Sequence, residues 1–447
     1  MKTMISVVIP AYNAADHLER CLTALSRSVD EPLECIVVDD GSTDDTVTVA
    51  KSLGAEVLST GGRCGPSRAR NLGAYAAKGE ILFFVDADVC VRPDTVGKIA
   101  GEFAGDMALD AVMGAYDVRP DAQNFMSQYR NLMHSFVHRS GRREATTFWS
   151  GCGAIRREVF LNAGGFDETF KNPAIEDIDL GYRLHGANRK LALNPGIEVK
   201  HLKSWSLRGL VKTDFLQRAL PWSELTLRTG RMPNDLNIKM SQRVSVAISF
   251  LLVLLAAYLA VKWHGLFLTP LFAAFFLVLS AYWVETVSQH SKVVSTLMAL
   301  IMGTVIVLAY VYHMFAIIPL MIVAWLALFL RHRYAYAQEA RRRWTGAVAG
   351  GFCLLVIAFA WTYMPIHPTA AAFSCLLLVL LYLNKGFYLF LAARRGKLFA
   401  LAAIPFHILY YLYSGLAFMV AVGRHVLRIA RGSAPPEPAK SRAAAAR

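Results

Sequence analysis

The sequence predicts an α/β domain followed by an all-α transmembrane domain, and two observations support this prediction. Apolar residues make up 55% of the 447 residues and charged residues only 18%, which is more apolar than an ordinary soluble domain. The excess is concentrated after residue 243, where long runs lack charge. Residues 1–243 instead alternate short β-branched runs with amphipathic stretches. We therefore expect two parts that fold in different solvents.

Strands and helices are expected to alternate through the first part. The expected strands cover residues 5–9, 34–38, 56–59 and 81–85, and the expected helices cover 16–25, 44–53 and 67–77. Helical crossovers between strands favour a mostly parallel sheet that is covered on both faces. Ligands bind such sheets at the carboxyl ends of the strands. Polar residues follow three of these strands, at 10–13, 39–42 and 86–88.

The second part contains six long apolar runs, at residues 244–261, 266–284, 293–330, 346–364, 370–393 and 398–422. A helix needs about 20 residues to cross the bilayer core, so the third run is expected to hold two spans. Four spans from a cytoplasmic start return the arginine-rich stretch 331–343 to the cytoplasm, in agreement with the positive-inside rule. The last run conflicts with that rule, because one further crossing places Arg424, Arg428 and Arg431 outside. Pro405 and His407 could mark a re-entrant or interfacial segment instead.

Charge and cysteine content exclude several classes of protein. The net charge is +14, but the basic residues sit mostly beside apolar runs, so we expect a membrane and no nucleic acid as the partner. The seven cysteines show no C-x-x-C pair and no zinc-ligand spacing, which suits a reducing cytosol. The first apolar stretch is too short for a signal peptide, so the first domain is expected to stay in the cytoplasm.

The expected domains are a catalytic domain at 1–200, an interfacial segment at 201–243, a transmembrane domain of about six or seven helices at 244–423 and a basic, disordered tail at 424–447. Nine basic residues stand against three acidic ones between Lys200 and Arg243, with Trp205 and Trp222 interspersed. Such a segment is typical of helices that lie on anionic headgroups. A soluble subdomain with a solvated face is the alternative.

Asp86 and Asp88 form a D-x-D text directly after a buried apolar strand. A hard divalent cation binds carboxylate oxygen, and Mg²⁺ commonly uses one or two carboxylates together with substrate phosphates. Taken alone, the motif is more typical of a solvated turn at a strand end than of a metal site.

The D-x-D motif is one of seven sequence motifs that occur in a fixed order along the chain. They are S-V-V-I-P-A-Y-N (6–13), V-V-D-D-G-S-T-D-D-T (37–46), G-P-S-R-A-R-N-L-G (65–73), V-D-A-D (85–88), G-C-G-A-I-R-R-E (151–158), G-G-F-D-E (164–168) and E-D-I-D-L-G-Y-R-L (176–184). This text closely resembles glycosyltransferase family 2, the inverting family built on the GT-A fold of nucleotide-diphospho-sugar transferases. The resemblance covers about residues 4–225, half of the chain.

The resemblance implies a nucleotide-sugar donor. The expected hydrogen bond between Asp40 and a uracil-like imide favours a UDP-sugar. Tyr12 would lie against the base, and Asp40 would accept a hydrogen bond from a uracil-like imide. The implied donor site also includes Pro10, Asp39, Ser42, Arg68, Arg70 and Asp86. Without the resemblance, D-D-G-S is typical of a turn that caps the next helix, and arginines near a helix start are common surface residues as well as phosphate ligands.

The resemblance also implies a bound Mg²⁺ or Mn²⁺. Asp88, with Asp86 nearby, matches the family's metal-binding D-x-D, where the ion would neutralise the departing diphosphate. His201 could be a further metal or phosphate contact, or a structural histidine.

The general base is expected in the E-D text. An inverting displacement needs a carboxylate that takes the proton of the acceptor hydroxyl, and Asp177 is the first choice, with Glu176 the second. Carboxylates in a first helical turn also favour the helix dipole without any catalysis. Gly151, Gln217 and Trp222 are the predicted acceptor-binding residues. Gln217 and Trp222 belong to an altered version of the Q-x-x-R-W motif of polysaccharide-synthesising relatives. This departure puts processive polymerisation in doubt.

We therefore expect a multi-pass enzyme of the inner (cytoplasmic) membrane, with its catalytic domain in the cytoplasm, that moves a sugar from a nucleotide diphosphate to a lipid or glycan acceptor at the membrane. A processive polysaccharide synthase with an export channel is the alternative. A third hypothesis is a non-enzymatic transporter or scaffold whose N-terminal domain is a catalytically inactive donor-binding domain. The presence of Asp86, Asp88 and Asp177 argues against this hypothesis, because an inactive site does not need all three.

Overall fold

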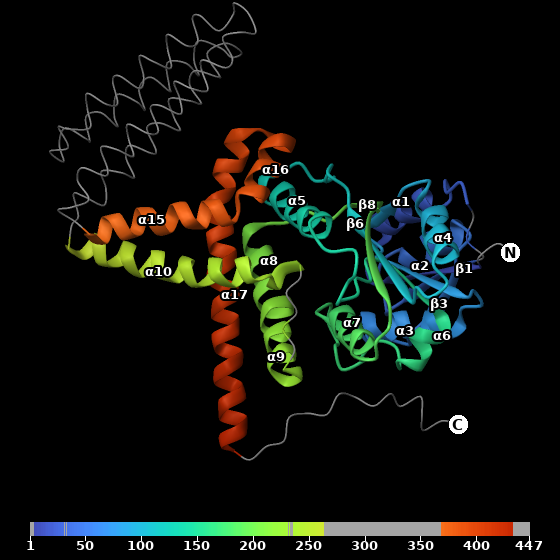
Figure 1. Cartoon of the computed structure of the whole chain (residues 1–447). Coiled ribbons are helices and arrows are strands. Elements are labelled where there is room, and N and C mark those ends of the chain that lie inside the picture. Colours follow the sequence, from blue (N-terminus) through green and yellow to red (C-terminus); the bar gives the residue numbers. More distant parts are fainter. Residues whose placement is uncertain are drawn as a thin grey trace, which may run out of the picture. The chain divides into compact units, whose positions relative to one another are not determined.

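The computed structural model describes residues 4–30, 32, 34–230, 232, 236–262 and 368–431. Among these, the residues up to 244 and from 405 onward form one compact unit, and residues 245–404 belong to a second (Figure 1). The expected spans at 266–284, 293–330 and 346–364, the loop at 331–343 and the tail from 432 lie outside the described residues.

The first half of the α/β domain follows the predicted order of strands and helices. It comprises β1 (Ile5–Ala11), α1 (Ala15–Leu25), β2 (Glu34–Asp39), α2 (Thr46–Ser52), β3 (Glu56–Ser59), α3 (Pro66–Ala76) and β4 (Ile81–Val85). Helix α2 begins two residues later than predicted, because the Asp44 carboxylate accepts hydrogen bonds from the amide and the hydroxyl of Thr46. Asp44 thus belongs to the turn that precedes the helix.

The second half of the domain adds β5 (Val89–Val91), α4 (Thr95–Gly105), β6 (Ala111–Tyr116), α5 (Phe125–Arg139), β7 (Cys152–Arg156), α6 (Arg157–Asn162), α7 (Glu176–Gly186) and β8 (Leu191–His201). All eight strands form one sheet in the order β3-β2-β1-β4-β7-β6-β8-β5. The pairs among β1 to β4 are parallel, as predicted. The other half is mixed, because β7 runs antiparallel to β4 and β6, and β5 runs antiparallel to β8.

The antiparallel direction of β7 brings the residues that precede it to the edge of the sheet where the motifs lie. Cys152, its first residue, pairs with Val85, the last residue of β4. The residues just before β7, Ser150 and Gly151, therefore arrive beside the turn that carries Asp86. A parallel strand would have placed them at the opposite edge.

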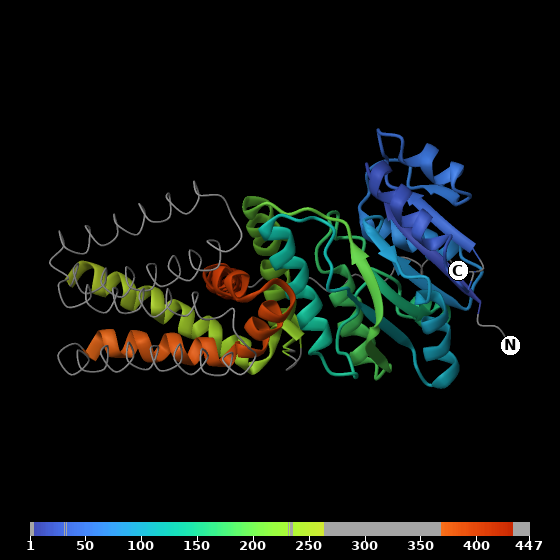
Figure 2. The same ribbon diagram turned by 90° about the horizontal axis from the view of Figure 1, so that it is seen from above.

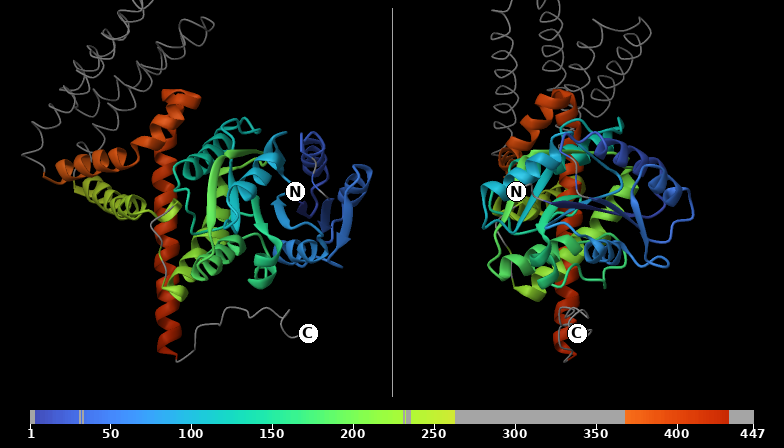
Figure 3. Two further views of the ribbon diagram at one scale, coloured as in Figure 1. Left: turned by 45° about the vertical axis from the view of Figure 1, so that its right-hand side comes forward. Right: turned by 90° about the vertical axis from the view of Figure 1, so that its right-hand side faces the viewer.

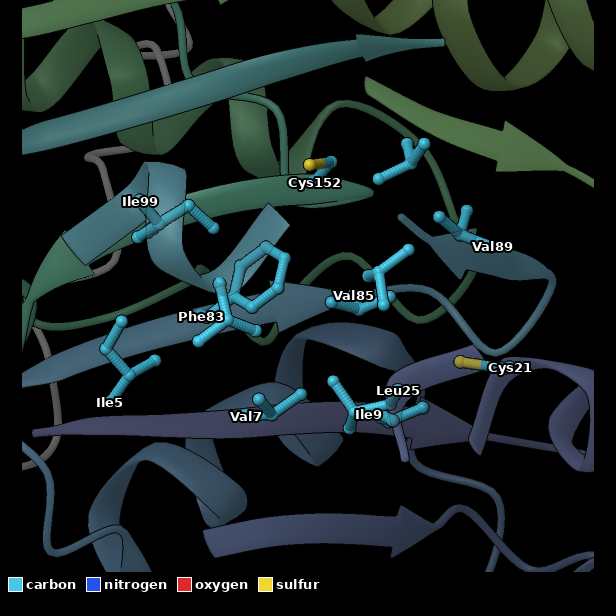
Figure 4. Packing of buried hydrophobic residues seen from close by; sticks show 14 of the residues in the cluster. Ile5, Val7, Ile9, Cys21, Leu25, Phe83, Val85, Val89, Ile99 and Cys152 are labelled. Atoms are coloured by element: carbon cyan, nitrogen blue, oxygen red, sulfur yellow. The ribbon is translucent and has the colours of Figure 1, made fainter. Parts of the chain in front are cut away.

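Two apolar layers cover the sheet, one on each face. On the first face, Val7 and Ile9 pack with Leu18 of α1 and Ile99 of α4, and Figure 4 shows part of this cluster around Phe83 and Val85. The second layer joins alternate strand residues to α3, α6 and α7, and it includes Val8, Phe84, Ala69, Phe160 and Leu180. The sheet therefore lies between helices on both faces, as seen from above in Figure 2.

A helical segment follows the sheet. It consists of α8 (Leu207–Lys212), the π-helix η1 (Thr213–Ala219), α9 (Leu220–Thr229) and the short 3₁₀ helix η2 (Leu236–Ile238). Helix α8 begins at a side-chain cap, because Ser206 Oγ accepts a hydrogen bond from the amide of Gly209.

The remaining described helices are apolar. They are α10 (Met240–Lys262), α15 (Pro368–Leu383), α16 (Lys385–Arg395) and α17 (Lys397–Ala430). By length and composition, α10 and α17 could each cross a membrane, and α15 with α16 could form a third span if the bent pair counts as one. The expected span at 370–393 is bent by 65° between α15 and α16. At this bend the Asn384 amide donates to Ser245 Oγ and to the Leu380 carbonyl.

Candidate active site

The carboxyl ends of β1, β2 and β4 bring the predicted donor residues to one edge of the sheet. Ala11 pairs with Asp39, and β1 also pairs with β4. Parallel strands end at the same edge, so the loops that follow them, which carry Tyr12, Asp40 and Asp86, are neighbours. The structure therefore brings together the residues that the sequence placed in the donor site.

The two aspartates after β2 organise the loops around them. The Asp39 carboxylate accepts from the amides of Gly41 (3.3 Å) and Ser42 (3.0 Å), which closes the turn. Asp40 is 5% exposed and accepts from the Thr60 hydroxyl and from two amides of the loop before α3, those of Cys64 (2.8 Å) and Gly65 (2.8 Å). A carboxylate has about four acceptor positions, and these three bonds occupy three of them.

Gly65 occupies a position that no other residue fits. Its φ is +101°, and an added Cβ would lie 2.5 Å from the carbonyl oxygen of Lys171. The loop after β3 thus presses against the loop that leads to Glu176. This contact ties the donor edge to the helix that carries the expected base.

Tyr12 and Ser42 lie at the open side of the same edge. The Tyr12 ring is 38% exposed, and the Arg63 guanidinium stands 4.5 Å from its centroid. Ser42 Oγ accepts from the amide of Asn13, and Asn13 in turn accepts from the amide of Thr43. Pro10 is the half-buried residue next to the end of β1.

Arg70 links the D-x-D turn to the E-D helix. The side chain is 5% exposed and donates to Asp86 at 2.6 Å and to Glu176 at 2.9 Å. Burial alone would lower the pKa of Arg70, but the two carboxylates outweigh it and raise that pKa. In this arrangement Arg70 faces protein carboxylates, whereas Arg68 is exposed and pairs with Glu168.

Asp88 and His201, two of the predicted metal ligands, lie next to each other. Their Oδ2 and Nε2 atoms are 3.4 Å apart. Asn131 Oδ1 lies 2.7 Å from Nδ1 of His201 and can accept a hydrogen bond from that nitrogen, which in the neutral ring leaves Nε2 free to coordinate a cation. Burial would raise the pKa of Asp88, but the electrostatic interaction and hydrogen bond with His201, together with the charge of Lys203, hold that pKa at about 2.

These two ligands fit a divalent cation that completes its shell with diphosphate oxygens and water. No cluster of three or more candidate ligand residues occurs among the described residues. Asp86, the other predicted ligand, directs Oδ1 toward Arg70.

Glu176 and Asp177 open helix α7 but have different surroundings. Glu176 is 3% exposed, bonds to Arg70 and accepts from the amide of Ala174. Asp177 is half-buried and accepts from the amides of Ser150 (3.2 Å) and Ile178 (2.8 Å). Burial and the adjacent charge of Glu176 raise the pKa of Asp177 to about 7, against the opposing effect of Arg70. A carboxylate with this pKa is suited to accept a proton near neutral pH.

Two of the three predicted acceptor residues, Gly151 and Trp222, lie near α7. Gly151 directly follows Ser150, which donates to Asp177. The Trp222 indole donates to the Tyr182 hydroxyl at 3.0 Å and packs with Ile175 and Leu225. Gln217 lies half-buried on η1. The structure thus places Trp222 against α7.

A cavity of about 200 Å³ lies on this side of the domain. It is bounded by the loop before α7, helix α9 and the end of α17, and its walls include Phe170, Ile175, Leu225, Arg228 and Arg428. Apolar, basic and acidic side chains therefore meet next to the helix that carries Asp177, the acidic ones being Asp167 and Glu224.

Several residues of the site were not singled out from the sequence. Asn71 holds the 164–168 motif, because its amide donates to the carbonyl of Phe166 and its oxygen accepts from the same residue's amide. Ser150 and Asn131 support Asp177 and His201. Asn71 lies inside a motif that the sequence displays, whereas long-range partners such as Asn131 leave no local pattern.

Together, this sheet edge, the D-x-D turn and the buried carboxylates at the start of α7 define a nucleotide-diphospho-sugar transferase domain of the GT-A type. The model of the family described as Glycosyl transferase family 2 matches residues 6–163. The N-acetylglucosaminyl-diphospho-decaprenol L-rhamnosyltransferase of Mycobacterium tuberculosis is 30% identical over 244 residues, which cover 46% of this chain and 78% of that protein. The chain belongs to glycosyltransferase family 2.

Other relatives match over the same part of the chain. Validoxylamine A glucosyltransferase of Streptomyces hygroscopicus subsp. jinggangensis is 31% identical, with 44% of this chain and 56% of the relative covered. The pre-mycofactocin glycosyltransferase of M. tuberculosis is 33% identical, with 46% and 45% covered. The chain thus spans about half the length of these two relatives. Among solved structures, a mannosyltransferase of Pyrobaculum calidifontis in complex with GDP-Man and Mn²⁺ is 18% identical with a TM-score of 0.40, covering 75% of this chain and 89% of that one.

Proposed function

We propose that this protein is an inverting glycosyltransferase that moves one sugar from a nucleoside diphosphate, preferably a UDP-sugar, to a lipid-linked acceptor at the cytoplasmic face of a membrane. The observation that carries the proposal is the pairing of two unlike carboxylates at the start of α7. Glu176 is neutralised by Arg70, whereas Asp177 is half-buried with a pKa raised to about 7. One carboxylate is structural and the other is poised as a base.

The transfer needs one proton acceptor and one leaving group. Asp177 takes the proton of the acceptor hydroxyl while that oxygen bonds to the anomeric carbon, and the bond from this carbon to the diphosphate breaks on the opposite face. A divalent cation on Asp88 and His201 would stabilise the charge of the departing diphosphate. Asp40 has one acceptor position left for an imide such as that of uracil, which supports a UDP-sugar.

The lipid-linked acceptor is supported by three features. Helices α10 and α17 are long and apolar enough for a membrane, and the cavity beside α7 has apolar walls with charged side chains of both signs, among them Arg228, Arg428 and Glu224. One relative is named for a decaprenol-linked acceptor. We place the protein in a cytoplasmic membrane, multi-pass, with the catalytic domain in the cytoplasm.

Release of nucleoside diphosphate from a panel of nucleotide sugars tests the proposal. Membranes that contain the protein should release it from one donor when Mg²⁺ or Mn²⁺ is present and should stop when a chelator is added. Asp88→Ala should lower donor affinity and turnover together. Asp94→Ala is the matched control, because Asp94 is an exposed carboxylate that pairs with Lys98 on α4. No release from any donor, or full activity of Asp88→Ala in chelator, would contradict the proposal.

A further inference from the structure

Residues 406–424 of α17 contact α5, η1 and α9 of the unit that contains the α/β domain, which is called the catalytic unit below. Near the first end, the Phe406 ring is 5.3 Å from the ring of Phe125 on α5. In the middle, Leu220 of α9 packs with Ala417 and Ala421. Figures 1 and 3 show α17 beside α9 from different sides.

A buried carboxylate fixes the helix in place. Asp214 is 3% exposed and binds Arg130 at 2.8 Å and Arg218 at 3.2 Å. Its second oxygen accepts from the Tyr413 hydroxyl at 2.7 Å. Asp214 lies on the π-helix η1, a rare form of helix that is frequently found at functional sites. The only acidic residue of η1 thus bonds to α5, to its own helix and to α17.

The last contact is a surface ion pair. Arg424 binds Glu224 of α9 at 2.9 Å, and both side chains are partly exposed. From Phe406 to Arg424 the helix therefore touches the catalytic unit over 19 residues, which rise about 27 Å at 1.5 Å per residue. The bilayer core is about 30 Å thick. Residues 397–404, which precede these contacts, reach only about 12 Å and are too short to cross.

The opposite side of this half-helix is apolar. Leu416, Met419 and Val426 are 47%, 51% and 56% exposed, and their spacing of three and seven residues places them on one face. Arg424, Arg428 and Arg431 lie at the end of the same segment, and all three are exposed. An apolar face with basic residues beside it fits the surface of a membrane that contains anionic lipids.

We propose that residues 405–430 do not cross the membrane but are clamped to the catalytic domain by Asp214 and rest on the membrane surface, on the side of that domain. The partner of the outward face is a bilayer with anionic headgroups. The high hydropathy of the segment comes from two apolar faces, one against protein and one against lipid. This arrangement keeps Arg424, Arg428 and Arg431 on the cytoplasmic side, and it removes the conflict with the positive-inside rule. The inference does not depend on the glycosyl transfer reaction.

Sidedness labelling of the full chain tests the crossing. In a background with all seven cysteines replaced, single cysteines at Val29, which is 80% exposed in the catalytic domain, and at Ala430 are treated with a membrane-impermeant maleimide. Both should react in inside-out vesicles, and both should stay protected in right-side-out vesicles. Reaction of Ala430→Cys and Val29→Cys from opposite sides would overturn the proposal.

Depth and dynamics test the surface position and the clamp. An environment-sensitive fluorescent label is placed on Leu412→Cys in nanodiscs that contain anionic phospholipid. Shallow lipid-borne quenchers should reduce its fluorescence more strongly than deep ones; the reverse result would mean that the segment crosses.

Tyr413→Phe should raise amide hydrogen exchange of residues 410–424 about tenfold, because a hydrogen bond to a charged group is lost. Tyr258→Phe, at a residue 47% exposed, is the control. Unchanged exchange in Tyr413→Phe would refute the clamp.

Discussion

At the residue scale, Asp177→Asn is expected to abolish transfer and leave donor binding intact. Asparagine keeps the size and can still accept from the Ser150 amide, but it cannot accept a proton at neutral pH. A general base contributes about 10²–10⁴-fold in rate, so kcat should fall by that amount. Steady-state kinetics and nucleotide-sugar binding by calorimetry measure the two effects separately.

The control for this variant has to be a carboxylate outside the E-D text. Glu176→Gln is unsuitable, because Glu176 neutralises buried Arg70, and removing one partner of a buried pair destabilises by about 3–5 kcal/mol. Asp94→Asn alters an exposed pair with Lys98 and should leave kcat within about twofold. Near-normal transfer by Asp177→Asn would show that the base lies elsewhere.

The pH dependence of transfer follows from the same carboxylate. Because the pKa of Asp177 is raised to about 7, the group is protonated and inactive below that pH and ionised above it. We expect kcat/KM to rise about tenfold per pH unit at low pH and to level off above about 7. An acidic limb centred near pH 4, the range of an ordinary carboxyl, would contradict this.

The free energy of unfolding should fall as the pH rises from about 4 to 7, because ionising a carboxyl whose pKa is raised disfavours folding above pH 4. Asp177→Asn should therefore unfold at a higher temperature than the parent at pH 8.

The sequence predicted single residues of the site better than their partners. Asp86, Asp88 and Asp177 stand in motifs whose spacing is visible in the chain, and the structure gathers them around one edge. Arg70 was expected at the diphosphate, yet it bonds to Asp86 and Glu176. Glu176 lies 106 residues from Arg70, and no local pattern can reveal a contact at that separation.

At the element scale, the position of α7 depends on Gly181. A Cβ at this residue would lie 2.2 Å from the backbone nitrogen of Phe148, so the helix approaches the 147–148 segment as closely as its backbone allows. Gly181→Ala should cost about 3 kcal/mol or more, since backbone cannot move aside as a flexible side chain can, and it should displace Asp177 from Ser150. Thermal unfolding and kcat should fall together.

Gly101→Ala supplies the matched comparison. Gly101 lies within α4, and a Cβ added there would meet no atom within 4 Å, so alanine should stabilise the domain by about 0.5–1 kcal/mol through helix propensity. Equal effects of the two substitutions would show that close packing of α7 is not what Gly181 provides.

Elements were predictable where local pattern and topology agree. Strands β1 to β4 are short apolar runs separated by amphipathic helices, which leaves parallel pairing as the natural solution. The direction of β7 was not predictable in this way, because a 12-residue segment separates it from α5 and such a connection permits either direction. Hydropathy likewise found the 370–393 run but not its bend, which depends on the contacts of Asn384.

At the scale of the whole molecule, hydropathy reports how apolar a helix is but not what covers it. Helix α17 is long and apolar enough to cross a membrane, yet residues 406–424 pack against the catalytic unit. The local signals were weak: Asp214 is a lone acid among basic residues, and Ala417 and Ala421 are small residues four positions apart. A small-residue stripe predicts close helix packing but does not identify the partner.

Product length distinguishes a single transfer from polymerisation, and we expect one discrete product, longer than the acceptor by one sugar. A processive enzyme needs a free aromatic platform to hold the growing chain, but Trp222 is already engaged, because its indole donates to Tyr182 and packs with Ile175 and Leu225. With a labelled lipid acceptor and excess donor, electrophoresis or mass spectrometry should show a single shifted species at every donor-to-acceptor ratio. Trp222→Phe removes the hydrogen bond to Tyr182 and should lower the rate by loosening α7, without altering the length of the product. A ladder of products that grows with donor concentration, and that shortens in Trp222→Phe, would instead identify a polysaccharide synthase in which Trp222 holds the polymer.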